Sequence, residues 1–221
     1  MAVLTDLVYP AKCILCQKLL TGQETDLCSH CRKAAPVLKK GNFKISFVAR
    51  WTAVWYYKDD VRKSLQRYKF SRKTGYAAVY GRLLAAKLQQ AGLDDFDLLT
   101  WVPTSFLRRW TRGFDHAALI ARVTARELGC QAVPTLRKVR HNPPQSSLKD
   151  AAARRANVLG AYRVKDRSLV AGKRILLLDD IITSGATVSE CAKTLTVAGA
   201  QSVLCAAVAA ASHDKKSNKT Q

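Results

Sequence analysis

Runs of apolar residues alternate with amphipathic stretches along most of the chain. Apolar, β-branched or aromatic runs predict strands over residues 45–57, 96–103, 174–180 and 202–211. Apolar residues at helical spacing between them predict helices over residues 59–68, 77–91, 115–128, 151–158 and 188–195. Buried strands that alternate with amphipathic helices are typical of an α/β fold, in which helices cover both faces of a parallel sheet.

Other segments lack this periodicity. Residues 33–42, "KAAPVLKKGN", indicate a linker, and residues 137–150, which contain Pro-Pro, indicate a mobile loop. The polar end of the chain indicates disorder. We therefore expect a small cysteine-containing unit over residues 1–42, an α/β domain over residues 43–211 and a basic tail over residues 212–221.

The charge of the chain indicates a polyanionic partner. Its 221 residues include 37 Lys and Arg but only 16 Asp and Glu, which gives a formal net charge of +21. Nucleic acids, phosphorylated metabolites and acidic membranes fit this charge, and a merely solvated basic surface is the alternative. The opening "MAVLTDLVYPAKC" lacks the features of a secretory signal, and no apolar run is long enough to span a bilayer. We expect a cytoplasmic protein with reduced cysteines.

Four of the seven cysteines form two Cys-x-x-Cys pairs, Cys13 with Cys16 and Cys28 with Cys31. Two such pairs suit a structural Zn²⁺ site, in which the metal supplies folding energy that so small a segment cannot obtain from a core. A redox pair is the weaker alternative, because one Cys-x-x-Cys would suffice for it. His30 could substitute as a ligand, although four thiolates already complete the set.

Residues 174–190, "RILLLDDIITSGATVSE", combine two carboxylates with a loop of small residues. A parallel strand would carry Asp179 and Asp180 to its carboxyl end, where ligands of such sheets bind. The glycine of the following loop permits a positive φ, so backbone N–H groups can converge on an anion at the start of the next helix. The loop residues are Thr183, Ser184, Gly185, Ala186 and Thr187.

The two carboxylates have a role if they do not contact the phosphate. Ionised Asp only accepts hydrogen bonds, and the 2′,3′-diol of a ribose offers two donors. The segment therefore indicates a ribose 5-phosphate site, with a capped helix after a strand as the structural alternative. A P-loop is excluded, because the only Gly-Lys pair is followed by Arg174 rather than Ser or Thr.

The segment "ILLLDDIITSGAT" resembles the phosphoribosyl-pyrophosphate (PRPP) signature of type I phosphoribosyltransferases. A wider resemblance covers nearly the whole chain. The paired Cys-x-x-Cys, "YKF", "VPTS", "RGFDH", "QSSL", "RRAN" and "DDIITSGAT" resemble, in this order, the ComF competence-protein family. That resemblance implies a phosphoribosyltransferase-like fold, a role in DNA uptake during natural transformation and a helicase-like partner. At Asp115 and His116 the chain departs from the usual Asn-Gln, and His116 is either a general base or a polar helix-start residue.

The resemblance also assigns roles to residues. Asp179 and Asp180 would hold the ribose diol as the catalytic acids, residues 183–187 would hold the 5′-phosphate, and Mg²⁺ would bridge diphosphate and ribose. PRPP also needs cations and further donors, because it carries several negative charges. The candidates for its pyrophosphate, on the loop after Pro103 and on a mobile lid over residues 137–157, are Thr104, Ser105, Arg112, Gln145, Arg154 and Asn157. An exposed basic helix start and an ordinary surface loop are the alternatives.

A second basic run follows the first predicted strand, and aromatic residues interrupt it. Cations beside aromatics suit single-stranded nucleic acid, although Tyr68 shares a helical stripe with Val61 and Leu65 and is better explained by core packing. The candidate contacts are Arg62, Lys63, Arg67, Lys69, Arg72 and Lys73. The family resemblance thus implies a DNA-uptake factor with a PRPP site, and the alternative is an active transferase that moves phosphoribosyl from PRPP to a nucleobase or amine with release of pyrophosphate.

Overall fold

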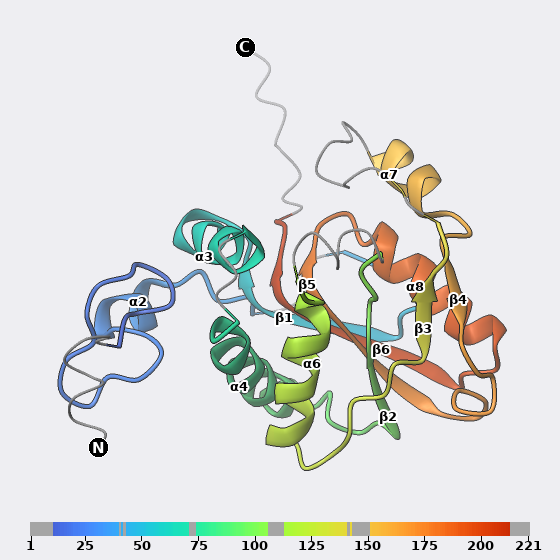
Figure 1. Ribbon diagram of the computed structural model, residues 1–221, viewed down its shortest axis with the longest axis horizontal. Helices are drawn as coiled ribbons and strands as arrows, with labels where there is room; N and C mark the ends of the chain where they lie inside the picture. The colour runs from blue at the N-terminus through green and yellow to red at the C-terminus, as the bar shows by residue number, and fades with distance from the viewer. Residues whose placement is uncertain are drawn as a thin grey trace.

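The computed structural model describes residues 11–39, 41, 43–70, 74–105, 113–140, 142 and 151–212. Figure 1 shows a central sheet between helices, with a small N-terminal unit to one side. The elements are α2 (Ser29–Ala34), β1 (Arg50–Tyr56), α3 (Asp59–Phe70), α4 (Tyr76–Gln90), β2 (Leu98–Trp101), α6 (His116–Glu127), β3 (Leu136–Lys138), α7 (Ala151–Val158), β4 (Tyr162–Val164), β5 (Arg174–Ile182), α8 (Ala186–Val197) and β6 (Ser202–Ala210).

Four strands form a parallel sheet in the order β1-β6-β5-β2. The apolar runs of β5 and β6 are buried because these two strands are central and are covered on both faces. The register places Leu178 between Trp101 of β2 and Ala206 of β6. The carboxyl ends of all four strands therefore lie at one edge of the sheet, which confirms the predicted parallel architecture.

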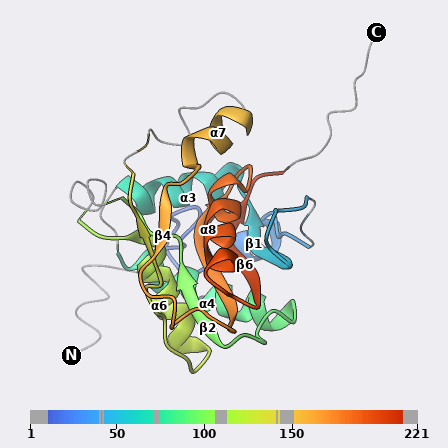
Figure 2. The same ribbon diagram turned by 90° about the vertical axis from the view of Figure 1, so that its right-hand side faces the viewer.

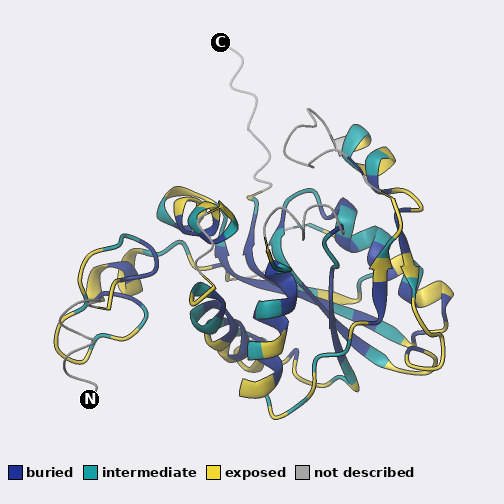
Figure 3. Ribbon diagram, in the orientation of Figure 1, coloured by how far each residue is buried: buried dark blue, intermediate teal, exposed yellow. Residues whose placement is uncertain are grey.

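Helices cover both faces of this sheet, as predicted. The helices α3, α4 and α6 pack on one face, where Leu176 and Leu178 of β5 join the fully buried Tyr68 in one apolar cluster. In Figure 2, α8 lies in front of the opposite face, where Leu177 contributes to a second cluster with Cys191. Figure 3 shows the buried residues concentrated along the sheet and the inner sides of the helices. Among the described helices, none has the length and apolar composition needed to cross a bilayer.

Three details differ from the sequence expectations. The segment predicted as a loop over residues 137–150 begins with a strand, because Leu136–Lys138 pairs antiparallel with Tyr162–Val164. Strands of three residues, two of them charged or polar, are too short for any periodicity to reveal. The predicted linker docks on β1, since the Leu38 N–H donates to the Val54 carbonyl at 3.1 Å. The first strand starts at Arg50 rather than at residue 45.

Candidate functional site

The acid pair lies near the end of β5, in the centre of the sheet. Four buried residues, 175–178, carry the strand through the core, and Asp179 and Asp180 follow as half-buried residues. The strand continues to Ile182, so the carboxylates stand just before its end. The Asp179 carboxylate accepts a hydrogen bond from the Asp180 backbone N–H at 2.8 Å. Asp179 and Asp180 therefore occupy successive positions at the edge where ligands of parallel sheets bind.

A lysine from another part of the chain joins the acid pair. The Lys69 ammonium of α3 lies 3.0 Å from Oδ1 and 2.9 Å from Oδ2 of Asp180. The two side chains retain only 22% and 15% of their surface, so water screens this ion pair weakly. The site therefore holds two carboxylates with one compensating cation.

The environment of Asp179 disfavours its ionised form. Burial of its carboxyl and the negative charge of Asp180 raise the pKa of Asp179 well above its ordinary value, and Lys69 opposes this only in part. Any ligand that donates hydrogen bonds to Asp179 would stabilise its ionised form.

The loop after β5 ends in a glycine with a left-handed backbone. Gly185 is the N-cap of α8 and has a φ of 73°, a conformation that favours glycine. A Cβ at this position would lie 3.1 Å from Cγ1 of Ile45 and 3.4 Å from Cε2 of Phe43, so the space is also closed to a larger residue. Gly185 and Ala186 are buried, while Thr183, Ser184 and Thr187 keep partial exposure. Three residues, 183–185, separate the end of β5 from Ala186, where the first free N–H groups of α8 begin.

The Asp115 carboxylate joins the segment after β2 to the start of α6. This role was not predicted for Asp115 from the sequence. Asp115 caps α6 by accepting from the Ala118 N–H at 3.2 Å. The same side chain accepts from the Thr104 N–H at 3.0 Å and from the Thr104 hydroxyl at 3.4 Å. The predicted pyrophosphate residue Thr104 is thus held by Asp115. Asp is a preferred N-cap residue, and Asp115 stands at the start of the predicted helix. That signal could have identified its capping role.

Ser105 has a different environment. It is 5% exposed, and its hydroxyl has no hydrogen-bond partner among the described residues. Buried hydroxyls are normally paired, so this one is available to a ligand oxygen. Arg112, the third predicted pyrophosphate residue of this loop, lies outside the described residues.

His116, the first residue of α6, is buried, with 2% of its surface exposed. Its Nε2 lies 3.2 Å from the Tyr68 carbonyl oxygen, and the Tyr68 hydroxyl donates to the His116 carbonyl at 2.8 Å. These contacts join α3 to α6, so the geometry favours the helix-start interpretation of His116 over a general base. Tyr68 is fully buried, as the helical stripe predicted.

The helix α7 carries two of the predicted lid residues. Arg154 and Asn157 are half-buried on this helix, which packs against α8. The Gly160 N–H donates to the Glu190 carboxylate of α8 at 2.8 Å and fixes the end of α7 there. Figure 1 shows α7 at the same edge of the molecule as the start of α8. Gln145, the remaining lid residue, lies outside the described residues.

The four described residues of the predicted nucleic-acid run fall into two groups. Arg62 and Lys63 are exposed on α3, and Lys63 lies 3.1 Å from Asp60. Arg67 and Lys69 instead bind within the protein, Arg67 to backbone carbonyls and Lys69 to Asp180. Arg72 and Lys73 lie outside the described residues.

The four cysteines of the N-terminal pairs come together. The Sγ atoms of Cys13, Cys16, Cys28 and Cys31 all lie within 4.8 Å of one another. Burial, and then contacts with the other three thiols, raise the pKa of Cys31, because several thiolates cannot be close together without a cation. Four sulfur donors in one cluster suit tetrahedral Zn²⁺, so the donor set fits a structural zinc ion, which would fix the fold of this unit.

Two side chains of α3 donate hydrogen bonds to backbone carbonyls of the cysteine unit. Ile14 and Leu15, between the first two cysteines, are 2% and 1% exposed. The Arg67 guanidinium donates to their carbonyls at 3.0 and 2.5 Å, and the Ser64 hydroxyl donates to the Ile14 carbonyl at 2.6 Å. One helix therefore contacts the cysteine unit through Ser64 and Arg67 and the acid pair through Lys69.

Comparison with known proteins gives two domain matches and several relatives. Residues 4–41 match the double zinc ribbon domain, and residues 115–220 match the phosphoribosyl transferase domain. The DNA utilization protein YhgH of Salmonella typhimurium is 30% identical over 220 residues, which cover 89% of this chain and 96% of that protein. Competence protein F of Haemophilus influenzae is 25% identical over 215 residues, which cover 87% of this chain and 93% of that protein.

Among solved structures, the glutamine PRPP amidotransferase from B. subtilis, complexed with ADP and GMP, is 26% identical, with a TM-score of 0.40. The similarity covers 58% of this chain and 25% of that chain, so the present protein spans about a quarter of the length of the amidotransferase.

Proposed function

The chain belongs to the ComF competence-protein family, and from that premise we propose that it is a DNA-uptake factor whose phosphoribosyltransferase domain binds PRPP or a related ribose 5-phosphate compound at the end of β5. Within the proposal, residues 1–42 form the zinc-ribbon unit, residues 43–211 the phosphoribosyltransferase unit and residues 212–221 a basic tail. The relatives named for DNA utilization and competence support the biological role.

One observation carries the ligand proposal. Two carboxylates, Asp179 and Asp180, are separated by only a few residues from Gly185, whose left-handed backbone starts α8. Carboxylates bind hydroxyl donors, and a helix N-terminus preceded by a glycine binds phosphate. A ribose 5-phosphate presents both groups one sugar length apart. The diol would contact the acid pair, and the phosphate would contact the backbone and hydroxyls of residues 183–187.

Lys69 explains how an anion site tolerates two carboxylates. Its ammonium offsets one negative charge at Asp180, which reduces the repulsion between the acid pair and an anionic ligand. We propose that Lys69 positions Asp180 for the diol. This role replaces DNA contact as our assignment for Lys69, because its ammonium is already paired and only 22% of its side-chain surface is exposed.

PRPP would require further groups for its diphosphate. The Ser105 hydroxyl, which has no partner among the described residues, is suited to donate to a diphosphate oxygen, and Thr104 would hold the loop through Asp115. We also propose Arg112, Gln145, Arg154 and Asn157 as contacts. Mg²⁺ would take most of its ligands from PRPP and water, since among the described residues the acid pair is not part of any cluster of three possible metal ligands.

The DNA part of the proposal rests on exposed charge. Arg62 and Lys63 remain on the surface of α3, and Arg72 and Lys73 follow that helix in the sequence. Cations of this kind bind single-stranded DNA through its phosphates, so affinity should fall steeply with salt. A helicase-like partner is a further element of the proposal. The docked zinc ribbon is the unit we propose for such a contact, because it stands to one side of the sheet (Figure 1).

A second candidate function is an active phosphoribosyltransferase. The acid pair, the Gly185 loop and the Ser105 hydroxyl are the groups that such a reaction would use to hold PRPP while an acceptor displaces pyrophosphate. Pyrophosphate release from PRPP and Mg²⁺, measured with each common nucleobase and with ammonia, separates the two functions. Release with any acceptor supports the enzyme, and no release with all of them supports a binding role.

The binding proposal is tested by calorimetric titration of PRPP with Mg²⁺ into the zinc-loaded protein and into its Asp179→Asn/Asp180→Asn variant. We expect saturable binding to the first protein and at least a tenfold loss in the second. An Asp95→Asn/Asp97→Asn variant is the matched control, because these two acids bind Arg174 at the opposite end of β5. Equal affinity in all three proteins, or no binding to the first, would contradict the ribose 5-phosphate site.

A further inference from the structure

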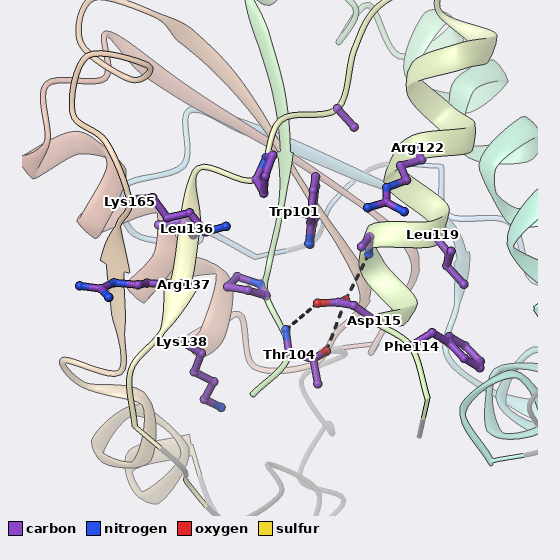
Figure 4. Close-up of a pocket in the computed structure, with 14 residues that line it drawn as sticks. Trp101, Thr104, Phe114, Asp115, Leu119, Arg122, Leu136, Arg137, Lys138 and Lys165 are labelled. Atoms are coloured by element: carbon purple, nitrogen blue, oxygen red, sulfur yellow. Dashed lines mark hydrogen bonds between the residues drawn. The ribbon is translucent and has the colours of Figure 1, made fainter. Parts of the chain in front are cut away.

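A cavity of about 600 Å³ opens beside the sheet at the end of β2. Figure 4 shows it between α6, the end of β2 and the start of the β3–β4 hairpin. Its described lining is Trp101, Pro103, Thr104, Phe114, Asp115, Ala118, Leu119, Arg122, Ala132, Pro134, Leu136, Arg137, Lys138 and Lys165. Neither acid of the pair nor any residue of the 183–187 loop belongs to this described lining, although Thr104 and Asp115, next to the proposed diphosphate contacts, do.

Positive charge in this lining exceeds the negative charge. The side chains of Arg122 and Lys165 turn toward Trp101 from opposite sides of the cavity, whereas Arg137 points away from it (Figure 4). No ion pair between described residues involves Arg122 or Lys165. The one carboxylate of the described lining, Asp115, already accepts three hydrogen bonds from Thr104 and Ala118. An anion in the cavity would therefore meet two cations that have no internal partner in the described structure.

The wall between these cations is aromatic and apolar. Trp101, at the end of β2, is 8% exposed and is flanked in the lining by prolines and aliphatic side chains. The volume lies within the range of ordinary ligand sites, which combine apolar walls with a few polar groups. A planar ring against an indole, with a phosphate at an Arg and a Lys, is the arrangement used for single-stranded nucleic acid.

We propose that this cavity binds one nucleotide unit of single-stranded DNA, with its base against Trp101 and its phosphates at Arg122 and Lys165. The inference rests on the proposed DNA-binding function and gives that function a site distinct from α3. It does not depend on PRPP binding, because Trp101, Arg122 and Lys165 have no proposed contact with PRPP.

The charge part of the inference is tested by fluorescence anisotropy with a labelled oligothymidine of about ten nucleotides, as a function of salt. We expect Arg122→Gln and Lys165→Gln each to weaken binding about fivefold and to reduce the slope of log K against log salt by about 0.7, which is the value for one lost phosphate contact on a single strand. Arg126→Gln, on the same helix, and Lys173→Gln are the controls, since neither residue belongs to the described lining. Both controls should bind like the unmodified protein.

The stacking part is tested through tryptophan emission. Oligothymidine should quench part of the emission of the unmodified protein, and that part should be missing from Trp101→Phe, which keeps an aromatic side chain in the core. Binding that is equally strong in the cavity variants and the controls, with unchanged quenching in Trp101→Phe, would overturn the cavity site while leaving DNA binding intact. No oligonucleotide binding by the unmodified protein would overturn the DNA function itself, and the cavity inference with it.

Discussion

The Lys69 ammonium lies within 3.0 Å of both carboxylate oxygens of Asp180, although the two residues are 111 positions apart in the chain. Lys69 belongs to the last turn of α3, and the same helix donates from Arg67 to the carbonyls of Ile14 and Leu15 in the cysteine unit. The acid pair and the proposed zinc ribbon are therefore joined through one helix. A change in one of these two contacts of α3 should therefore affect the other.

Replacement of Lys69 by Met should destabilise the protein by about 2 kcal/mol. Loss of one partner from a fully buried ion pair typically costs about 3 to 5 kcal/mol, and the remaining exposure of this pair lowers the figure. Chemical denaturation measures the free energy of unfolding. Lys63→Met is the control on the same helix. Its exposed pair with Asp60 contributes less than about 1 kcal/mol, and equal losses in the two variants would contradict the role of Lys69.

Asp179 should make stability depend on pH. Its folded pKa is raised above the ordinary value of 3.8 by burial and by Asp180. The folded protein therefore holds a proton that the unfolded chain has already released, and the free energy of unfolding falls as pH rises from about 4 through the raised pKa. In Asp179→Asn this fall should be absent, so the variant should gain stability relative to the unmodified protein as pH increases. Thermal unfolding from pH 4 to 8 measures the difference, and a difference independent of pH would count against the raised pKa.

Substitution of Gly185 by Ala should disturb the phosphate loop. A non-glycine residue in the left-handed region costs about 1 to 2 kcal/mol, and the close approach of Ile45 and Phe43 adds a packing penalty of similar size. Gly172→Ala isolates the backbone effect, because Gly172 has a φ of 72° with no atom within 4 Å of an added Cβ. The first variant should lose about twice as much stability as the second.

The affinity of the Gly185→Ala and Gly172→Ala variants for ribose 5-phosphate tests whether the loop binds phosphate. Gly185→Ala should weaken binding at least tenfold, whereas Gly172→Ala should leave it unchanged. If both variants bind like the unmodified protein, the 183–187 loop does not hold the phosphate.

Removal of zinc should loosen α3 as well as the cysteine unit. The Cys28→Ser variant should lose the metal, about one zinc ion per chain in the unmodified protein, as measured by atomic emission. Hydrogen exchange should then accelerate in α3, since Ser64 and Arg67 lose their ordered partners in the segment around Ile14. Cys130→Ser, which changes a cysteine outside the cluster, should keep both zinc and protection. Full α3 protection without zinc would show that the helix does not depend on the cysteine unit.

The parts of this site that are continuous in sequence could be predicted from it. Asp179, Asp180 and the Gly185 loop follow one another along a strand, a turn and a helix, so their spacing alone brings them together. The cysteine pairs are likewise local, and metal geometry limits their arrangement. The central strands were recognisable as apolar runs, and the long helices were recognisable by the helical spacing of their apolar residues.

Contacts between distant segments could not be predicted in this way. Lys69 and Arg67 look like surface cations on an amphipathic helix, because the sequence does not show that β5 and the cysteine unit cover that side of α3. The β3–β4 hairpin was missed because its strands have only three residues each. Its register, and the cavity beside it, depend on tertiary packing that no short motif encodes.

The central claim is that the acid pair recognises a ribose diol, and it is tested most directly by comparing two sugars. Calorimetry would give the affinities of ribose 5-phosphate and 2-deoxyribose 5-phosphate for the zinc-loaded protein and for Asp179→Asn/Asp180→Asn. The account predicts that loss of the 2-hydroxyl weakens binding at least fivefold in the unmodified protein and changes little in the variant. Equal affinities of the two sugars for the unmodified protein would contradict it.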